Sequence, residues 1–144
     1  MKRAAVAALL VGVVAFAAAA SSHIVAEPLE PEKAFRLSAR PAPDREAIVL
    51  HFSIEEGYYL YRDRFKVEAA NLPVGTVVLP DGIEKDDPFV GRARILTRSA
   101  ALRLPLTASV KPGTYRLKVT AQGCAEERVC YAPFTQTVTV RWPG

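Results

Sequence analysis

The two cysteines of this chain lie close together, in the segment Gln122-Gly123-Cys124-Ala125-Glu126-Glu127-Arg128-Val129-Cys130-Tyr131. The sequence contains no other cysteine, and the five residues between the pair exclude the Cys-x-x-Cys motif of thioredoxin-like proteins. Two thiols at this spacing form either a structural disulfide or a centre for thiol–disulfide exchange. The function of the protein depends on which of the two it is.

A purely structural disulfide is the first alternative. A bond between Cys124 and Cys130 closes a short loop, which in a chain-entropy model contributes roughly 2–2.5 kcal/mol to stability. The disulfide of an immunoglobulin domain joins strands that are distant in sequence, and this pair does not. A small disulfide beside polar residues is instead of the kind that can be exposed and reducible. The spacing alone leaves both interpretations open.

The remaining residues offer little other chemistry. The sequence has two histidines, His23 and His51, and with two cysteines these are too few for a structural zinc site. His51 falls on the outward face of a predicted strand. The sequence has no phosphate-binding glycine-rich loop, no Gly-x-Ser-x-Gly nucleophile elbow and no paired carboxylates typical of a hydrolase. Any covalent chemistry is therefore expected at the cysteines, without a metal or an organic cofactor.

The first twenty residues have the layout of a secretory signal peptide. Lys2 and Arg3 precede an unbroken apolar run, Ala4–Ala20, whose last residues are small enough for signal peptidase. We expect a signal peptide over residues 1–20, with cleavage as late as Ala26 as an alternative. A retained membrane anchor is the other alternative, although a spanning helix needs about 20 apolar residues. Export places the cysteines in an oxidising compartment.

The charge of the chain does not indicate a nucleic-acid partner. The formal net charge is +4 and becomes +2 once Lys2 and Arg3 of the signal peptide are removed. The nearest approach to a basic stripe is Arg92, Arg94, Arg98 and Arg103. We interpret these as a solvated strand face, because nothing in the sequence resembles a nucleic-acid-binding module.

The rest of the chain shows the alternation of apolar and polar residues that is typical of β-strands. The clearest segments are Ile48–Ile54, Tyr115–Ala121 and Phe134–Trp142, and shorter candidates are Phe65–Ala69, Thr76–Leu79, Arg94–Thr97 and Ala101–Leu106. Turn residues separate them, and no segment has a helical period. The sequence therefore predicts an all-β sandwich over residues 35–142, preceded by an N-terminal arm over residues 21–34.

Three stretches of the sequence resemble one known family. Gln122–Pro133 closely resembles the active-site hairpin of the N-terminal periplasmic domain of the thiol:disulfide interchange protein DsbD. Gly57–Arg62 is similar to that family's Gly-Tyr-Tyr-Leu-Tyr motif, and Asp86–Gly91 is similar to its cap loop. The three stretches occur in the family's order, and the resemblance extends from about Phe35 to Val140.

This resemblance implies an immunoglobulin-like β-sandwich with both cysteines on one edge hairpin. It implies that Cys130 forms the disulfide to a partner protein and that Cys124 resolves it. Phe89 would be the cap residue that covers the sulfurs until a partner displaces it. The other residues expected to line the site are Tyr59, Tyr61 and Asp87.

The resemblance also implies a periplasmic relay of reducing equivalents, a component of protein-disulfide reduction. The donor would be a thioredoxin-like protein or a membrane electron carrier on a separate chain. The acceptors would be oxidised periplasmic proteins, such as disulfide isomerases or thiol proteins of cytochrome c maturation. We expect a monomer. The alternative function is a non-catalytic immunoglobulin-like binding or assembly module with a permanent structural disulfide.

Overall fold

The computed structural model describes residues 26–144. The expected signal peptide and His23 lie outside the described residues. Strands make up most of the described part, and two short helical turns, α1 (Pro31–Ala34) and the 3-10 turn η1 (Arg62–Arg64), accompany them. None of the helices in this part has the length and hydropathy that crossing a bilayer requires.

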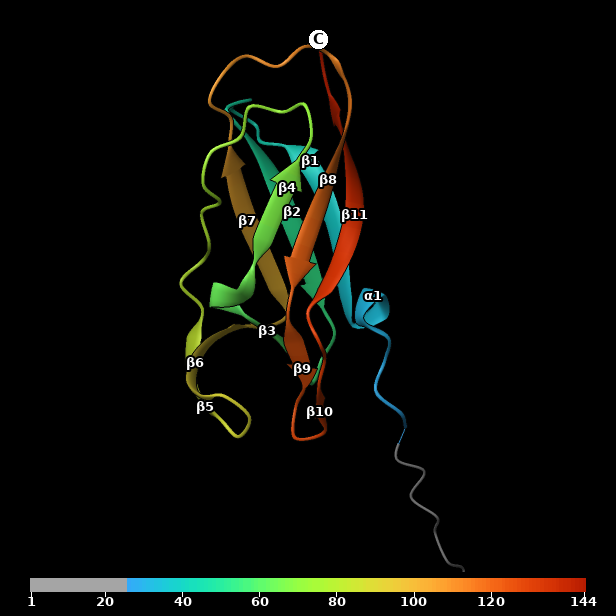
Figure 1. Ribbon diagram of the computed structural model, residues 1–144, viewed down its shortest axis with the longest axis vertical. Coiled ribbons are helices and arrows are strands. Elements are labelled where there is room, and N and C mark those ends of the chain that lie inside the picture. Colours follow the sequence, from blue (N-terminus) through green and yellow to red (C-terminus); the bar gives the residue numbers. More distant parts are fainter. Residues whose placement is uncertain (1–25) are drawn as a thin grey trace, which may run out of the picture.

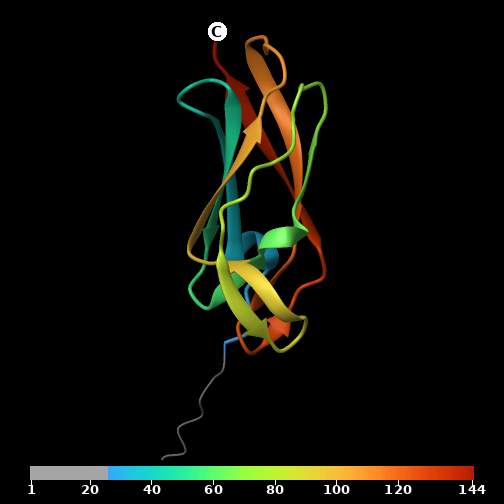
Figure 2. The same ribbon diagram turned by 90° about the vertical axis from the view of Figure 1, so that its left-hand side faces the viewer.

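Two three-stranded antiparallel sheets form the layers of a sandwich (Figure 1). One sheet has the order β1-β2-β7, with β1 at Phe35–Pro41, β2 at Ala47–Ile54 and β7 at Ser99–Pro105. The other has the order β11-β8-β4, with β11 at Phe134–Trp142, β8 at Gly113–Ala121 and β4 at Lys66–Ala69. The view in Figure 2 shows the two layers from the side. The predicted all-β sandwich is confirmed.

Alternating side chains of these strands build the main core. In β2, Ile48, Leu50 and Phe52 are fully buried, and in β8, Leu117 and Val119 are buried whereas Lys118 between them is exposed. This pattern arises because successive side chains of a strand point to opposite faces of the sheet. The core is completed mainly by other large apolar side chains of the two sheets and of the segments beside them, namely Phe35, Leu60, Leu102, Leu104, Val140 and Trp142.

A third sheet lies at one end of the sandwich, at the bottom of Figure 1, with the order β10-β9-β3-β6-β5. Its strands are β3 (Tyr58–Tyr61), β5 (Ile83–Asp87), β6 (Gly91–Leu96), β9 (Gly123–Ala125) and β10 (Val129–Cys130). All four residues of β3 are buried. We call β5, β6 and their turn the cap hairpin, and β9, β10 and their turn the cysteine hairpin.

The last residues of the N-terminal arm are held against this same end. The Leu29 N–H donates to the Tyr58 hydroxyl at 2.8 Å, and the Tyr131 hydroxyl donates to the Leu29 carbonyl at 2.6 Å. The Arg128 guanidinium donates to the Ala26 carbonyl. The pKa of Tyr131 is raised to about 12, mainly because its hydroxyl is partly buried. The arm thus contacts β3, the turn of the cysteine hairpin and the residue that follows β10.

The three long predicted strands are present, and one predicted strand is wrong. Thr76–Leu79 is not a strand: only Val78 forms a bridge, to Arg103 of β7. A second bridge joins Val74 to Leu106. The two bridges are four residues apart on this side and three apart on the other, so they are out of register and no continuous ladder forms. β1 was not among the predicted strands, although its burial alternates along the strand. Alternation could not reveal β3, which is buried on both faces, or β5, which is mostly charged.

Candidate functional site

The cysteine hairpin carries a disulfide between directly opposed residues. Cys124 of β9 pairs across the ladder with Cys130 of β10, and their sulfurs are bonded. The Arg128 N–H closes the turn between them by donating to the Ala125 carbonyl at 3.1 Å. Cys124 is fully buried, whereas Cys130 is partly exposed. The sulfur of Cys130 is therefore on the more accessible residue of the pair.

Gly123 allows β9 to lie against its neighbours. A Cβ at this position would overlap the Tyr59 carbonyl oxygen and would lie 2.9 Å from the Phe35 ring. Tyr59 is paired directly with Cys124 in the ladder between β3 and β9. The absent side chain therefore sets how closely the cysteine strand approaches β3.

The Tyr61 hydroxyl lies beside both sulfurs. It is 3.1 Å from Cys124 Sγ and 3.5 Å from Cys130 Sγ. Neither sulfur of a disulfide carries a proton, so the hydroxyl is the only possible donor in these contacts. Burial is the main cause that raises the pKa of Tyr61, and the hydroxyl keeps its proton at neutral pH.

A small hydrophobic cluster, separate from the main core, encloses the disulfide. Its buried members are Tyr59, Tyr61, Ile95 and Cys124, with Ala93 and Cys130 packed against them. The rings of Tyr59 and Tyr61 meet edge to face, with their centroids 5.6 Å apart. Of the residues predicted to line the site, both tyrosines thus lie directly beside the cysteine pair.

Asp87 is the one charged side chain that is buried in the described part of the chain, at 4% exposure. Burial opposes its ionisation, but the Tyr59 hydroxyl and the N–H groups of Phe89 and Val90 donate to its carboxylate. These hydrogen bonds outweigh burial and lower the pKa of Asp87. Asp87 therefore holds a negative charge and fixes the turn of the cap hairpin.

Phe89 lies in that turn, and its backbone rather than its ring is fixed. Its N–H donates to Asp87 Oδ1 at 2.8 Å, whereas its side chain is 53% exposed. The neighbouring Val90 is also exposed. The structure thus connects Phe89 to the site through Asp87 and Tyr59.

The sequence-based reasoning missed Lys85 and Glu126. Lys85 Nζ of β5 lies 2.7 Å from Glu126 Oε1, which is in the turn of the cysteine hairpin, and 5.4 Å from the centroid of the Tyr59 ring. The two residues are 41 positions apart in the chain. Two oppositely charged residues at that separation carry no local signal, and only the resemblance of both flanking motifs could have brought them together.

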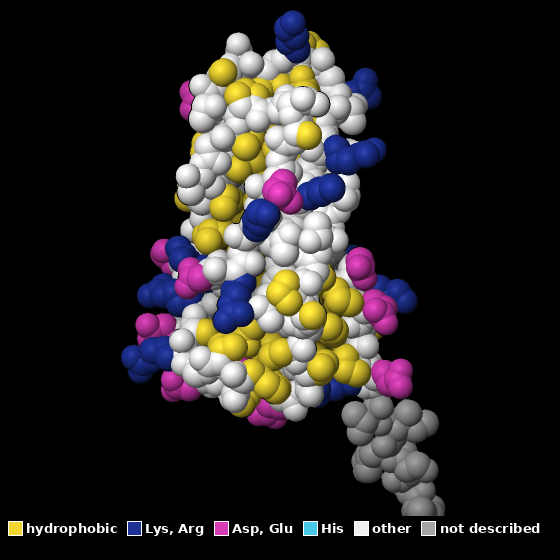
Figure 3. All heavy atoms as spheres, viewed as in Figure 1, with side chains coloured by type: hydrophobic (Ala, Val, Ile, Leu, Met, Phe, Trp, Pro, Cys, Tyr) yellow, Lys and Arg dark blue, Asp and Glu magenta, His cyan; other side chains and the backbone are white. Residues whose placement is uncertain are grey.

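The surface at this end of the molecule is partly apolar. Figure 3 shows hydrophobic side chains gathered on the lower part of the face where Figure 1 places β9 and β10. The exposed apolar residues at this end include Leu29, Phe89, Val90 and Val129. Such a surface around a disulfide is suited to contact with another protein.

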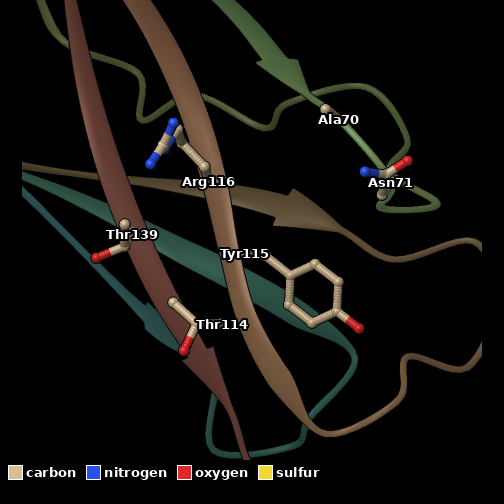
Figure 4. Close-up of a pocket in the computed structure, with 6 residues that line it drawn as sticks. All are labelled: Ala70, Asn71, Thr114, Tyr115, Arg116 and Thr139. Atoms are coloured by element: carbon tan, nitrogen blue, oxygen red, sulfur yellow. The ribbon is translucent and has the colours of Figure 1, made fainter.

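A surface pocket elsewhere offers no comparable chemistry. It has a volume of about 440 Å³ and is lined by Ala70, Asn71, Thr114, Tyr115, Arg116 and Thr139. In Figure 4 these side chains spread over β8, β11 and the loop after β4 and do not converge on a common point. None of them belongs to the predicted site, so the cysteine hairpin is the better candidate.

The sandwich and this hairpin define a class, a β-sandwich domain with a cysteine pair at its edge. The sequence model of the family described as "Thiol:disulfide interchange protein DsbD, N-terminal" matches residues 25–141. The chain belongs to this family. The resemblance noted from three motifs is thereby confirmed.

Curated relatives agree with this assignment. DsbD 1 of Pseudomonas aeruginosa is 38% identical over 110 residues, which are 75% of this chain and 18% of that protein. DsbD of Cronobacter sakazakii is 41% identical over 91 residues, which are 63% of this chain and 16% of that protein. The chain thus spans less than one fifth of the length of these relatives.

Two solved structures have the same fold. The reduced DsbD N-terminal domain of Neisseria meningitidis superposes with a TM-score of 0.70 and 32% identity, covering 81% of this chain and 91% of that one. The complex between the DsbD and PilB N-terminal domains of the same organism gives 0.64 and 33%, covering 77% and 85%. The immunoglobulin-like sandwich expected from the resemblance is confirmed.

Proposed function

We propose that this domain exchanges thiols and disulfides with other proteins through Cys124 and Cys130. The observation that carries the proposal is the disulfide itself, which joins a buried and a partly exposed cysteine beside a tyrosine hydroxyl. The family membership supports the same chemistry. The bond lies in a small cluster outside the main core, which favours exchange over a purely structural role.

The exchange conserves electrons and protons. A donor dithiol reduces the Cys124–Cys130 disulfide to two thiols and becomes a disulfide itself. The Cys130 thiolate then attacks a disulfide of the acceptor and forms a mixed disulfide, releasing one acceptor thiol. The Cys124 thiolate displaces the second acceptor sulfur, which restores the disulfide and transfers two electrons. Cys130 takes the attacking role because it is the more accessible cysteine.

The surrounding residues influence these steps in opposite directions. The protonated Tyr61 hydroxyl can donate to a sulfur as negative charge develops on it. The Asp87 carboxylate opposes a nearby thiolate through like charge, which keeps the resting thiols protonated and less reactive. Asp87 also shapes the turn that carries Phe89, the residue proposed to cap the sulfurs before a partner docks.

The proposed partners are proteins with their own thiol pairs. In the solved Neisseria complex, a DsbD N-terminal domain is associated with a PilB N-terminal domain, which supports docking of another protein domain here. The proposed donor is a thioredoxin-like protein or a membrane electron carrier. The proposed acceptors are disulfide isomerases or cytochrome c maturation proteins, and the proposed location is the periplasm.

Single-cysteine variants test this function. Cys124→Ser should accumulate a mixed disulfide with glutathione when it is incubated with glutathione disulfide, because no resolving thiol remains. Cys130→Ser should form much less, because Cys124 is buried. Mass spectrometry of the intact domain measures the adduct. Equal labelling of both variants would contradict the assigned roles.

The reduction potential separates exchange from a structural disulfide. Equilibration of the domain with glutathione or dithiothreitol buffers, followed by thiol trapping, measures it. A relay should give about −200 to −270 mV, whereas a structural disulfide should lie below about −300 mV. A value well below −300 mV would support the non-catalytic binding module instead.

A further inference from the structure

We propose that Lys85 is a positioning residue that ties the cap hairpin to the cysteine hairpin and so limits access of small redox reagents to the disulfide. The inference rests on the proposed function in one respect, namely that Cys124 and Cys130 are the reacting pair. It assigns a role to a contact that the exchange chemistry itself does not use.

The cap hairpin and the cysteine hairpin are not neighbours in the third sheet, yet an ion pair joins them. In the strand order β10-β9-β3-β6-β5, the strands β9 and β5 are three positions apart, which is roughly 14 Å in a flat sheet. Yet Lys85 Nζ on β5 lies 2.7 Å from Glu126 Oε1, which directly follows β9. Figures 1 and 2 both show the two hairpins projecting at the same end of the molecule. The ion pair therefore joins β5 of the cap hairpin to the turn of the cysteine hairpin.

Lys85 also joins a continuous series of contacts to the cap turn. Its ammonium group lies over the Tyr59 ring, and the Tyr59 hydroxyl donates to Asp87. Asp87 in turn accepts the N–H groups of Phe89 and Val90. The contacts lead from Glu126, between the two cysteines in sequence, to the tip of the cap hairpin.

The electrostatics keep Lys85 in its charged form. The pKa of Lys85 is raised mainly by the hydrogen bond to Glu126, and the negative charge of Asp87 raises it further. The Lys85 side chain is 22% exposed, and that of Glu126 is 51% exposed. The pair is thus open to solvent on the Glu126 side, where salt can screen it.

The strength of these contacts suits a reversible closure. An exposed ion pair shifts an equilibrium by about two- to fivefold, and a cation over an aromatic ring contributes a similar factor at an exposed site. A docking protein that buries more surface can overcome both. A small reagent gains no such surface, so Lys85 slows small reagents more than it slows proteins.

Reduction of the disulfide by an uncharged phosphine tests the proposal on the purified domain. Tris(hydroxypropyl)phosphine attacks one sulfur and breaks the S–S bond, and water then hydrolyses the adduct. Water supplies the oxygen of the phosphine oxide and the two protons of the thiols. Because the reagent carries no charge, removal of a protein charge does not change its approach. Lys85→Met should accelerate reduction by about three- to tenfold, and Glu126→Gln by about two- to fivefold.

Three comparisons distinguish the loss of this ion pair from the effect of removing any lysine charge. The charge swap Lys85→Glu with Glu126→Lys restores the ion pair but not the contact of a cation with the Tyr59 ring. It should therefore be reduced about two- to fivefold more slowly than Lys85→Met, without reaching the wild-type rate. Lys66→Met, which breaks a 3.1 Å pair with Glu68 on β4, is the matched control and should leave the rate unchanged. Raising the salt concentration should accelerate reduction of the wild type and leave Lys85→Met little changed.

The inference is overturned if Lys85→Met is reduced at the wild-type rate, or if the swap and the control behave like Lys85→Met. Its failure is distinguishable from failure of the proposed function, which the glutathione adduct and the reduction potential measure. If Lys85→Met is reduced at the wild-type rate while Cys124→Ser forms its glutathione adduct, only the role of Lys85 is contradicted. If Lys85→Met is reduced faster but Cys124→Ser forms no adduct, only the exchange function is contradicted.

Discussion

Among single side chains, Asp87 combines burial with charge in an unusual way. Three donors, the Tyr59 hydroxyl and the N–H groups of Phe89 and Val90, surround its carboxylate. An isolated buried carboxylate would be neutral, but hydrogen bonds to the ionised form reverse that tendency. The same residue therefore stabilises the cap turn and places a negative charge in the site.

Replacement of Asp87 by asparagine tests this stabilisation. At pH 7 we expect Asp87→Asn to lower the free energy of unfolding by about 1–3 kcal/mol, because an amide cannot accept all three donors equally well. Urea unfolding followed by circular dichroism measures the difference. Asp63→Asn, at a side chain that is 70% exposed, is the control and should change stability by less than about 0.5 kcal/mol.

The same carboxylate predicts a dependence on pH. Its folded pKa is lower than the ordinary value of 3.8, so the unfolded chain binds its proton first as the pH falls. The stabilisation is complete above the unfolded pKa and is lost as the pH falls through the lower, folded pKa. The difference between wild type and Asp87→Asn should therefore shrink below about pH 4. A constant difference down to pH 2 would contradict an ionised Asp87.

Among the strands, β9 depends on one glycine for its position. Gly123→Ala should displace the cysteine hairpin from β3 and lower the free energy of unfolding by about 1–3 kcal/mol, since the new Cβ overlaps the Tyr59 carbonyl. Gly75→Ala, where the nearest atom is Pro105 Cγ at 3.3 Å, is a milder control. Unfolding of both variants and their phosphine reduction rates would show whether the hairpin moved.

The strands also show what a single sequence can predict. β2, β8 and β11 each bury one face, so their alternation was visible. β3 buries both faces, and β5 is an edge strand of largely charged residues, so neither has a period to detect. Cys124, Tyr61 and Asp87 lie in separate segments that meet only through the third sheet, so they were found from the three motifs and not from any pattern. Lys85 was missed because it lies outside those motifs.

For the molecule as a whole, the separation of the two apolar clusters has a measurable consequence. The main core lies mainly between the two three-stranded sheets of the sandwich, whereas the disulfide belongs to the small cluster at one end. Reduction should therefore lower the free energy of unfolding by only about 2 kcal/mol and leave the far-ultraviolet circular dichroism spectrum unchanged. Leu102→Ala, in the main core, should cost about 2–5 kcal/mol. Unfolding upon reduction would indicate a structural disulfide.

The position of Trp142, the only tryptophan of the chain, has an optical consequence. It pairs with Gly113 at one end of the ladder between β8 and β11, and the cysteine hairpin follows the other end at Ala121, roughly 27 Å away along the strand. Disulfides quench aromatic emission at contact distance. Tyrosine emission, through Tyr61, should therefore brighten when the bond is reduced, while tryptophan emission should report only whether the sandwich is folded.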